Sequence, residues 1–200
     1  LYFDTPQFSD FHDKAGGFME RKKIRARIYE DYLTEKTPQL WLEVKHKRDM
    51  RVFKERVAIT AGELEDIINF RDPRLRQGYG GQAGRDEPVL KKILFHIFRE
   101  QRRPVAFIRY KRKPYLFKMG GIEARFTLDY DIEACLSRSL GYNSSTFKIQ
   151  PDYFVLEVKF DKFLPGWFDF IIKKYNLKRD TFSKYARSIE AIRRFNPIPR

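Results

Sequence analysis

The sequence predicts an α+β fold in one domain, residues 1–200, in which most strands pair antiparallel. Segments with alternating apolar and polar side chains follow one another after short connections, which favours antiparallel over parallel pairing. Segments with helical periodicity lie between some of these strands and end the chain. Of the 200 residues, 42% are hydrophobic and 16% aromatic, which is enough for a substantial core.

The first elements predicted are a strand end and a short helix. "LYFD" is typical of a strand, and Thr5-Pro6 suits the start of a helix that runs to about Lys14 and stops at Gly16-Gly17. The chain begins without Met and inside this strand, so we expect the first strand of the domain to be missing and its N-terminus to be incomplete.

Three strands with one charged face follow. In "RKKIRARIY" the side chains of Lys23, Arg25 and Arg27 alternate with those of Ile24 and Ala26. The segments "QLWLEVKHK" and "RVFKERVAI" repeat this period of two. Each segment therefore predicts a strand with basic side chains on one face and packing side chains on the other.

The middle of the chain predicts two helices around a loop. "TAGE" at Thr60–Glu63 is a capping box that opens a short helix, and "EPVLKKILFHIFREQ" has helical periodicity. Between them, residues 76–87 are rich in glycine and predict a flexible surface loop. This loop lacks the G-x-x-x-x-G-K-[ST] pattern of a phosphate-binding loop.

The second half predicts further strands and two final helices. "PVAFIRYKR", "YLFKM", "EARFTLDYDIE" and "YFVLEVKF" are strand-like, with turns at Lys113-Pro114 and Gly120-Gly121. "PGWFDFIIKKYN" and "DTFSKYARSIEAIRRF" are helical. The whole chain thus has about seven strands.

Charge narrows the class of partner. The formal net charge is +14, which implies an anionic partner such as nucleic acid, anionic lipid or a phosphorylated small molecule. The one cysteine, Cys135, excludes an intrachain disulfide and favours a reducing, cytoplasmic location. No apolar run approaches the roughly 20 residues of a membrane span.

The charged strand faces suggest where that anion binds. Residues i and i+2 of a strand lie on one face, roughly 6.5–7 Å apart. The same-face sets are Arg25 with Arg27; Glu43 with Lys45 and Lys47; Lys54 with Arg56; Tyr110 with Arg112; Arg125 with Thr127 and Asp129; and Glu157 with Lys159. For any one strand a solvated outer face is the simpler interpretation, but six strands carry charged side chains on one face in this way.

A closed barrel would explain why all of these strands carry a charged face. If the sheet closes, Lys and Arg line its interior and repel one another unless a polyanion, such as a phosphate chain, lies between them. Glu43 and Glu157 then suit a divalent metal that bridges to phosphate. Each can instead pair with the Lys two residues on, and for Glu43 the two roles are equally supported.

An ordered set of motifs resembles a known family. The stretches "LYFDTP", "RKKIRARIY", "LEVKHK", "FKER", "RYKRKPY", "ARFTLDYD", "LEVKFDKFLPGW" and "FSKYARSIE" resemble, in that order, the VTC (vacuolar transporter chaperone) domain. This domain is the polyphosphate polymerase module of the triphosphate tunnel metalloenzyme superfamily, also called CYTH-like. The resemblance implies an antiparallel β-barrel tunnel with flanking and C-terminal helices, a nucleoside triphosphate at its centre, and Mn²⁺ or Mg²⁺ as cofactor.

Site residues are carried over by position. The implied catalytic and phosphate-binding residues are Arg25, Arg27, Lys45, Lys54, Arg112, Arg125 and Lys184, joined by Arg56 and Lys159 for substrate binding. Glu157 is the implied metal ligand, with Glu43 as a second candidate. The chain departs from the family at its absent first strand and at Thr181, where some members carry a second lysine.

The resemblance implies an ATP-dependent polyphosphate polymerase whose partners are ATP and polyphosphate. The nearest alternative is a tunnel triphosphatase acting on inorganic or nucleoside triphosphate, since water can replace the phosphate acceptor. A non-catalytic binder of polyphosphate or RNA is a third alternative. RNA is disfavoured, because few aromatic side chains beyond Tyr29 and Tyr110 share the basic faces.

Overall fold

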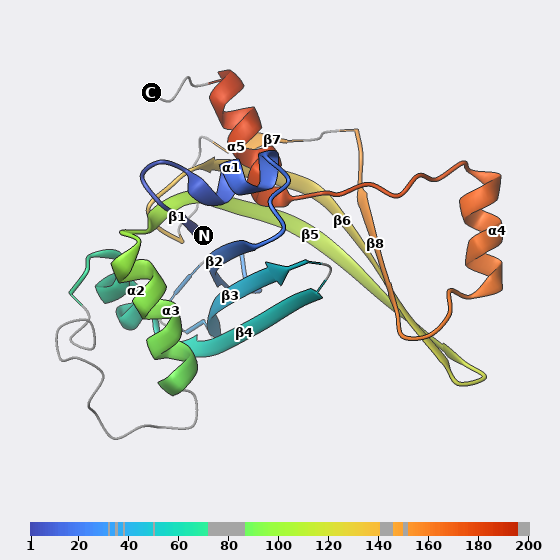
Figure 1. The fold of residues 1–200 in the computed structure, drawn as a ribbon, viewed down its shortest axis with the longest axis horizontal. Coiled ribbons are helices and arrows are strands. Elements are labelled where there is room, and N and C mark those ends of the chain that lie inside the picture. The colour runs from blue at the N-terminus through green and yellow to red at the C-terminus, as the bar shows by residue number, and fades with distance from the viewer. Residues whose placement is uncertain are drawn as a thin grey trace.

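The chain forms one antiparallel sheet with helices on both sides of it, as the computed structural model in Figure 1 shows. The structure describes residues 1–31, 33–34, 36–37, 39–49, 51–71, 87–140, 146–149 and 152–195. The predicted glycine-rich loop lies outside these residues, except for its last residue. The α+β class and the antiparallel pairing are confirmed, since every strand pair in the described residues is antiparallel.

The elements occur close to where the sequence predicts them. In chain order they are β1 (Tyr2–Asp4), α1 (Ser9–Ala15), β2 (Arg21–Arg27), β3 (Leu40–Arg48), β4 (Arg51–Ile59), α2 (Ala61–Ile68), α3 (Glu87–Arg99), β5 (Arg103–Met119), β6 (Ile122–Leu136), β7 (Phe147–Lys148), β8 (Val155–Phe160), α4 (Gly166–Lys174) and α5 (Lys184–Phe195). The Thr60–Glu63 capping box is present at α2. Among the described helices, none is long and apolar enough to cross a membrane.

Helix α1 begins later than predicted. Pro6 lies in a turn, and the helix starts at Ser9. The Asp4 carboxylate accepts hydrogen bonds from the backbone N–H groups of Asp10 and Phe11, at 3.0 and 3.3 Å, and so caps the helix from the end of β1. Helix α1 ends at Gly16, as predicted.

The sheet is open, and the prediction of a closed barrel is wrong for the described residues. The strand order is β4-β3-β2-β1-β5-β6-β7, with β8 paired to β6 beside β7. No backbone ladder joins β8 to β4 within the described part of the chain. Closure requires hydrogen bonds between those two outer strands, and alternation within a strand carries no information about them.

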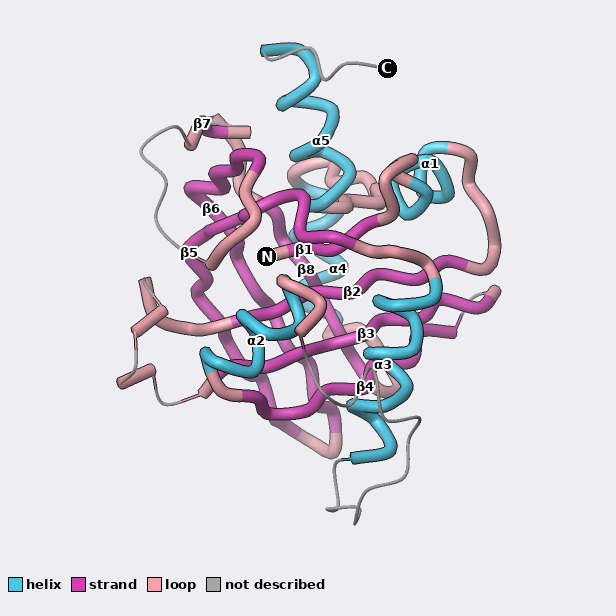
Figure 2. Tube along the Cα trace, turned by 90° about the vertical axis from the view of Figure 1, so that its left-hand side faces the viewer, coloured by secondary structure: helices cyan, strands magenta, loops and turns pink. Residues whose placement is uncertain are grey.

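The main core lies on one face of β1–β4. Ile24, Ala26, Leu42 and Val44 are fully buried there, as their alternation predicts. Helices α2 and α3 cover this face. Figure 2 shows both helices in front of β3 and β4. The charged side chains of the same strands therefore point to the opposite face.

Strands β5 and β6 form one long hairpin, and the predicted turn at Lys113-Pro114 is wrong. Pro114 lies within β5 opposite Thr127 of β6. Among the described strands, β1 is the other neighbour of β5, and it pairs only with the first residues, so no ladder bond is lost to the ring of Pro114. The predicted turn at Gly120-Gly121 is correct, and both glycines have positive φ (56° and 75°), as a two-residue hairpin turn requires.

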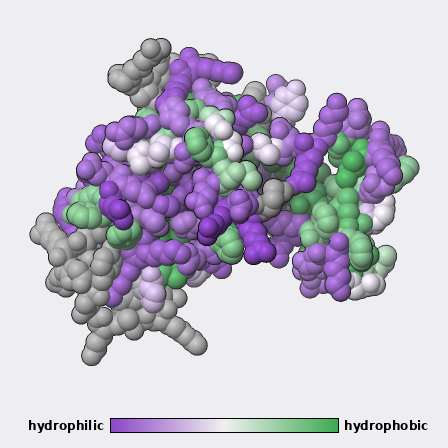
Figure 3. Space-filling model, in the orientation of Figure 1, coloured by the Kyte–Doolittle hydropathy of each residue, from purple (hydrophilic) through white to green (hydrophobic). Residues whose placement is uncertain are grey.

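The hairpin tip and α4 extend away from α2 and α3 (Figure 1). Phe168 of α4 packs on Phe126 of β6, with ring centroids 4.8 Å apart. Trp167 and Phe170 stay exposed, and Figure 3 shows hydrophobic surface gathered around this helix. Helix α5 instead packs on β1 and β5 through Tyr185, Ile189 and Ile192.

Candidate active site

The basic side chains of β2, β3 and β4 form rungs across the face opposite the main core. Each rung joins one residue from each strand through the backbone register. The three rungs are Arg27–Trp41–Ala58, Arg25–Glu43–Arg56 and Lys23–Lys45–Lys54. Five of the predicted site residues besides Glu43 therefore lie within three neighbouring rungs, about 7 Å apart along the strands.

Glu43 lies at the centre of the middle rung and is 2% exposed. Its Oε2 lies 2.7 Å from Arg25 Nη2, and its Oε1 lies 2.7 Å from Lys54 Nζ. Burial alone would raise the pKa of Glu43, but Arg25 and Lys54 together lower it. Both oxygens thus face cations, so Glu43 orients Arg25 and Lys54, which favours this role over that of a metal ligand.

Asp129 of β6 is a second buried carboxylate, and it orients two other predicted residues. It is fully buried, and it accepts hydrogen bonds from Arg112 Nε and Nη2 at 2.6 and 2.7 Å. Lys184, at the start of α5, donates to the same carboxylate. Burial opposes the charge of Asp129, but these two partners lower its pKa. One carboxylate therefore holds cations from β5 and α5 side by side.

Glu157 of β8 differs from both buried carboxylates. Its side chain is 43% exposed, with Oε1 3.2 Å from Lys159 Nζ and Oε2 3.6 Å from Arg112 Nη2. In the β6–β8 register Glu157 lies opposite Thr127, and Lys159 lies opposite Arg125. Glu157 is thus the carboxylate of this region with the most accessible oxygens.

The cations around Glu43 and the cations around Asp129 and Glu157 lie close enough to influence one another's charge. Although Lys45 is exposed, nearby protein atoms reduce the hydration of its amine and lower its pKa, and Glu157 and Lys159 also act on its charge. Arg25 donates to the Tyr2 hydroxyl at 3.1 Å. The pKa of Tyr2 is lowered, although burial opposes this, because Arg25 and the amines of Lys23 and Lys184 surround it. Strands β2, β3, β8 and helix α5 are therefore electrostatic neighbours even though the sheet is open.

We call the whole set the basic array. It consists of Lys23, Arg25, Arg27, Lys45, Lys54, Arg56, Arg112, Arg125, Lys159 and Lys184. Within the described residues, five of its members have no carboxylate within ion-pair distance: Lys23, Arg27, Lys45, Arg56 and Arg125. Lys23 donates to the Ser183 hydroxyl, and the other four can bind an anionic ligand without displacing a carboxylate.

Helix α5 borders one end of the array. The Ser183 hydroxyl accepts hydrogen bonds from Lys23 Nζ at 2.6 Å and from the backbone N–H of Ala186 at 3.2 Å. It therefore caps the helix and holds Lys23 of the rung Lys23–Lys45–Lys54 in place. Tyr185 stacks on Tyr2 with ring centroids 5.2 Å apart. This packing fixes Lys184, the first residue of the helix, over Asp129.

The structure places all eleven predicted residues in the described part of the chain and adds three. Arg25, Lys54 and Glu43 are brought into contact, as are Arg112, Glu157 and Lys159. Asp129, Tyr2 and Lys23 were not predicted as site residues. Alternation places Asp129 on the face of Arg125, but only the tertiary structure shows that it binds Arg112 and Lys184.

A divalent cation can be held by Glu157. Mg²⁺ and Mn²⁺ are commonly bound by one or two carboxylates together with the phosphate oxygens of a substrate. Glu157 offers an accessible carboxylate beside cations that would hold those phosphates, so it fits this role. In the described residues, no group of three or more His, Cys, Asp or Glu side chains could hold a metal by itself.

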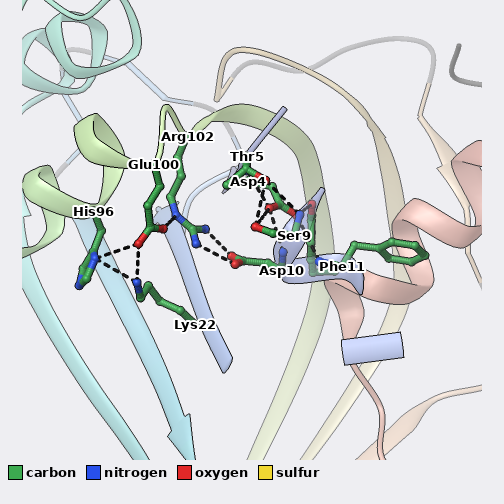
Figure 4. A network of polar contacts seen from close by, with 10 residues as sticks. Asp4, Thr5, Ser9, Asp10, Phe11, Lys22, His96, Glu100 and Arg102 are labelled. Carbon is green, nitrogen blue, oxygen red and sulfur yellow. Dashed lines mark hydrogen bonds and ion pairs between the residues drawn. The ribbon is translucent and has the colours of Figure 1, made fainter. Parts of the chain in front are cut away.

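A second polar network, shown in Figure 4, lies on the other side of β2. Several of its residues line a groove of about 970 Å³. Buried Arg102 donates to both oxygens of buried Asp10, at 2.5 and 2.8 Å, and to Glu100 at 2.6 Å. Glu100 also accepts from Lys22 at 2.7 Å. These pairs join α1, β2 and the end of α3, so we assign the network a structural role.

We expect Glu100→Gln to remove part of the acid dependence of stability. Burial opposes the charge of Glu100, but Lys22 and Arg102 lower its pKa from 4.5 to about 2. Its contribution is therefore present above about pH 4.5 and lost as the pH falls towards 2. Urea unfolding at pH 6, 5, 4 and 3.5 should show a wild-type advantage that shrinks with acidification. Glu190→Gln, which breaks only an exposed pair with Arg187, serves as control. A pH-independent difference would contradict the assignment.

Comparison with known families gives one clear match. The model described as "VTC domain" matches residues 1–193, nearly the whole chain. No curated protein matches. The matched range contains every residue of the basic array, together with Glu43, Asp129 and Glu157.

Proposed function

Because the chain belongs to the VTC domain family, we propose that it is an ATP-dependent polyphosphate polymerase whose substrate lies along the basic array. One observation carries the proposal: ten cationic side chains from seven elements share one region, and two buried carboxylates orient four of them. A region this positive suits a ligand with many closely spaced negative charges.

In the proposed reaction a terminal oxygen of the polyphosphate chain attacks the γ-phosphorus of ATP. The bond between this phosphorus and the bridging oxygen breaks, ADP leaves, and the chain gains one phosphate. In such transfers the protein mainly positions the groups and neutralises charge, so no protein nucleophile is required. Arg25 and Lys54, held by Glu43, and Arg112 and Lys184, held by Asp129, would take up the charge of the transferred group.

Glu157 would hold Mn²⁺ or Mg²⁺, which would neutralise charge on the phosphate oxygens when bound. The remaining catalytic contribution is then orientation. Since Glu43 and Asp129 are buried and ion-paired on several sides, they keep the guanidinium and ammonium groups in place before substrate arrives.

Product analysis tests the proposal. The protein is incubated with ATP and Mn²⁺, and the products are separated by gel electrophoresis and assayed for orthophosphate. Long-chain polyphosphate with equimolar ADP supports a polymerase. Orthophosphate without polyphosphate would refute polymerisation and favour the triphosphatase. Binding without turnover would refute both enzymes.

Arg125→Ala should weaken binding of inorganic tripolyphosphate by about tenfold, the equivalent of one charge-assisted hydrogen bond. Arg125 is exposed and has no carboxylate partner in the described residues, so its loss should leave the fold unchanged. Arg187→Ala is the matched control, because Arg187 lies on α5 and pairs with Glu190. Calorimetric titration compares the two. Equal weakening would mean that net charge alone binds the anion.

A further inference from the structure

One end of the basic array differs from the rest in carrying aromatic rings. Arg27 and Trp41 face each other across β2 and β3, and the Arg27 guanidinium lies over the Tyr29 ring, 4.4 Å from its centroid. The Arg56 guanidinium lies over the Trp41 ring at 4.2 Å. Both arginines belong to the five members of the array without a carboxylate partner in the described residues.

This end is also open. Tyr29 is exposed, and the residue opposite Trp41 on β4 is Ala58, an exposed residue whose side chain is a single methyl group. On that rung β4 contributes only a methyl group, and the β4 side chain that contacts the Trp41 ring is that of Arg56 on the next rung. The other end of the array is occupied by α5, through the hydrogen bond from Lys23 to Ser183.

Phosphate groups alone do not explain the aromatic rings. An oxyanion gains from a cation but gains nothing from the face of an indole or phenol ring, whose quadrupole is negative. A nucleobase, by contrast, stacks on aromatic rings and on guanidinium planes. A guanidinium lying over a ring also keeps its in-plane N–H donors available for a base or a phosphate.

We propose that Tyr29, Trp41, Arg27 and Arg56 bind the nucleobase of the nucleoside triphosphate, and thereby fix its direction along the array. The triphosphate then extends from this rung over Arg25 and Glu43 towards Lys45 and Lys54. The inference rests on the proposed function, since it assumes that a nucleoside triphosphate binds the array. It adds which end receives the nucleoside.

The arrangement predicts a difference between two ligands that share a triphosphate group. Inorganic tripolyphosphate has no base, so Trp41→Ala should leave its affinity within about twofold of wild type. The same substitution should weaken ATP binding about tenfold, within the range for loss of one base–aromatic stack. Trp41→Phe keeps a ring and should recover part of the loss. Calorimetric titration measures these three affinities, and metal is omitted so that ATP is not turned over.

Fluorescence provides an independent readout. The chain has two tryptophans, Trp41 and Trp167, and Trp167 lies on α4 outside the array. In a Trp167→Phe background the emission reports on Trp41 alone. We expect ATP to quench this emission and tripolyphosphate to leave it nearly unchanged.

The outcomes separate the inference from the proposed function. If wild type binds tripolyphosphate but Trp41→Ala weakens both ligands equally, or weakens neither, the base site is wrong while the phosphate array stands. Quenching by tripolyphosphate as strong as that by ATP would also overturn the base site. If wild type binds neither ligand, the proposed function fails, and the base site fails with it.

Discussion

Glu157→Gln should abolish metal-dependent turnover of ATP while leaving the fold intact. Among the described carboxylates of the site, Glu43 and Asp129 are buried in ion pairs, whereas Glu157 is 43% exposed with oxygens accessible to a cation. Removing its charge should reduce turnover with Mn²⁺ by more than the roughly 10- to 100-fold typical of residues that only support a metal ligand. Initial rates over a range of Mn²⁺ concentrations measure the effect.

Metal-free binding distinguishes loss of a metal ligand from damage to the site. Without metal, the Glu157 carboxylate repels phosphate, so Glu157→Gln should bind tripolyphosphate at least as tightly as wild type. Glu55→Gln is the matched control: Glu55 is 33% exposed and paired with Lys92, but it lies on the opposite face of β4. Full Mn²⁺-dependent activity in Glu157→Gln would refute the metal-ligand assignment.

Alternation predicts most of the site because it reports directly on which face a side chain occupies. Arg25 and Arg27 point away from Ile24 and Ala26 whatever strand lies beside them, so period two alone separates charge from core. The same reasoning holds for Glu43 and Lys45, which alternate with Leu42 and Val44. The family motifs then select the members that are predicted to bind phosphate.

The register between strands and the closure of the sheet cannot be predicted from alternation. The position of Glu43 between Arg25 and Arg56 depends on how three strands align, and a shift of one residue would change every contact. A closed barrel and the observed open sheet require the same alternation. Pro114 is a turn signal in most contexts, yet it lies within β5 because β6 is its only neighbour in the described residues at that point.

Asp129 shows why a buried carboxylate is hard to predict from sequence. In "ARFTLDYD" it resembles its neighbour Asp131, two residues on. A bulge opposite Arg109–Lys111 and a positive φ of 49° at Asp131 change the direction of the strand between them. As a result, Asp131 pairs with exposed Lys111, while Asp129 is buried under Arg112 and Lys184.

This difference leads to a matched pair of variants. Asp129→Asn leaves Arg112 and Lys184 side by side without the buried carboxylate that both of them contact, so the free energy of unfolding should fall by about 3 kcal/mol. Asp131→Asn breaks only exposed pairs, with Lys111 and Lys148, and Asn tolerates the left-handed backbone there, so the loss should be much smaller. Urea unfolding at neutral pH compares both variants with wild type.

A phosphate ligand should partly restore the Asp129→Asn variant, because it can replace the missing negative charge between Arg112 and Lys184. We therefore expect tripolyphosphate to raise the melting temperature of Asp129→Asn by more than it raises that of wild type. The increase for Asp131→Asn should equal that of wild type. A smaller increase in Asp129→Asn would mean that Arg112 and Lys184 serve only the packing of α5 against the hairpin, and that the phosphate chain lies elsewhere on the array.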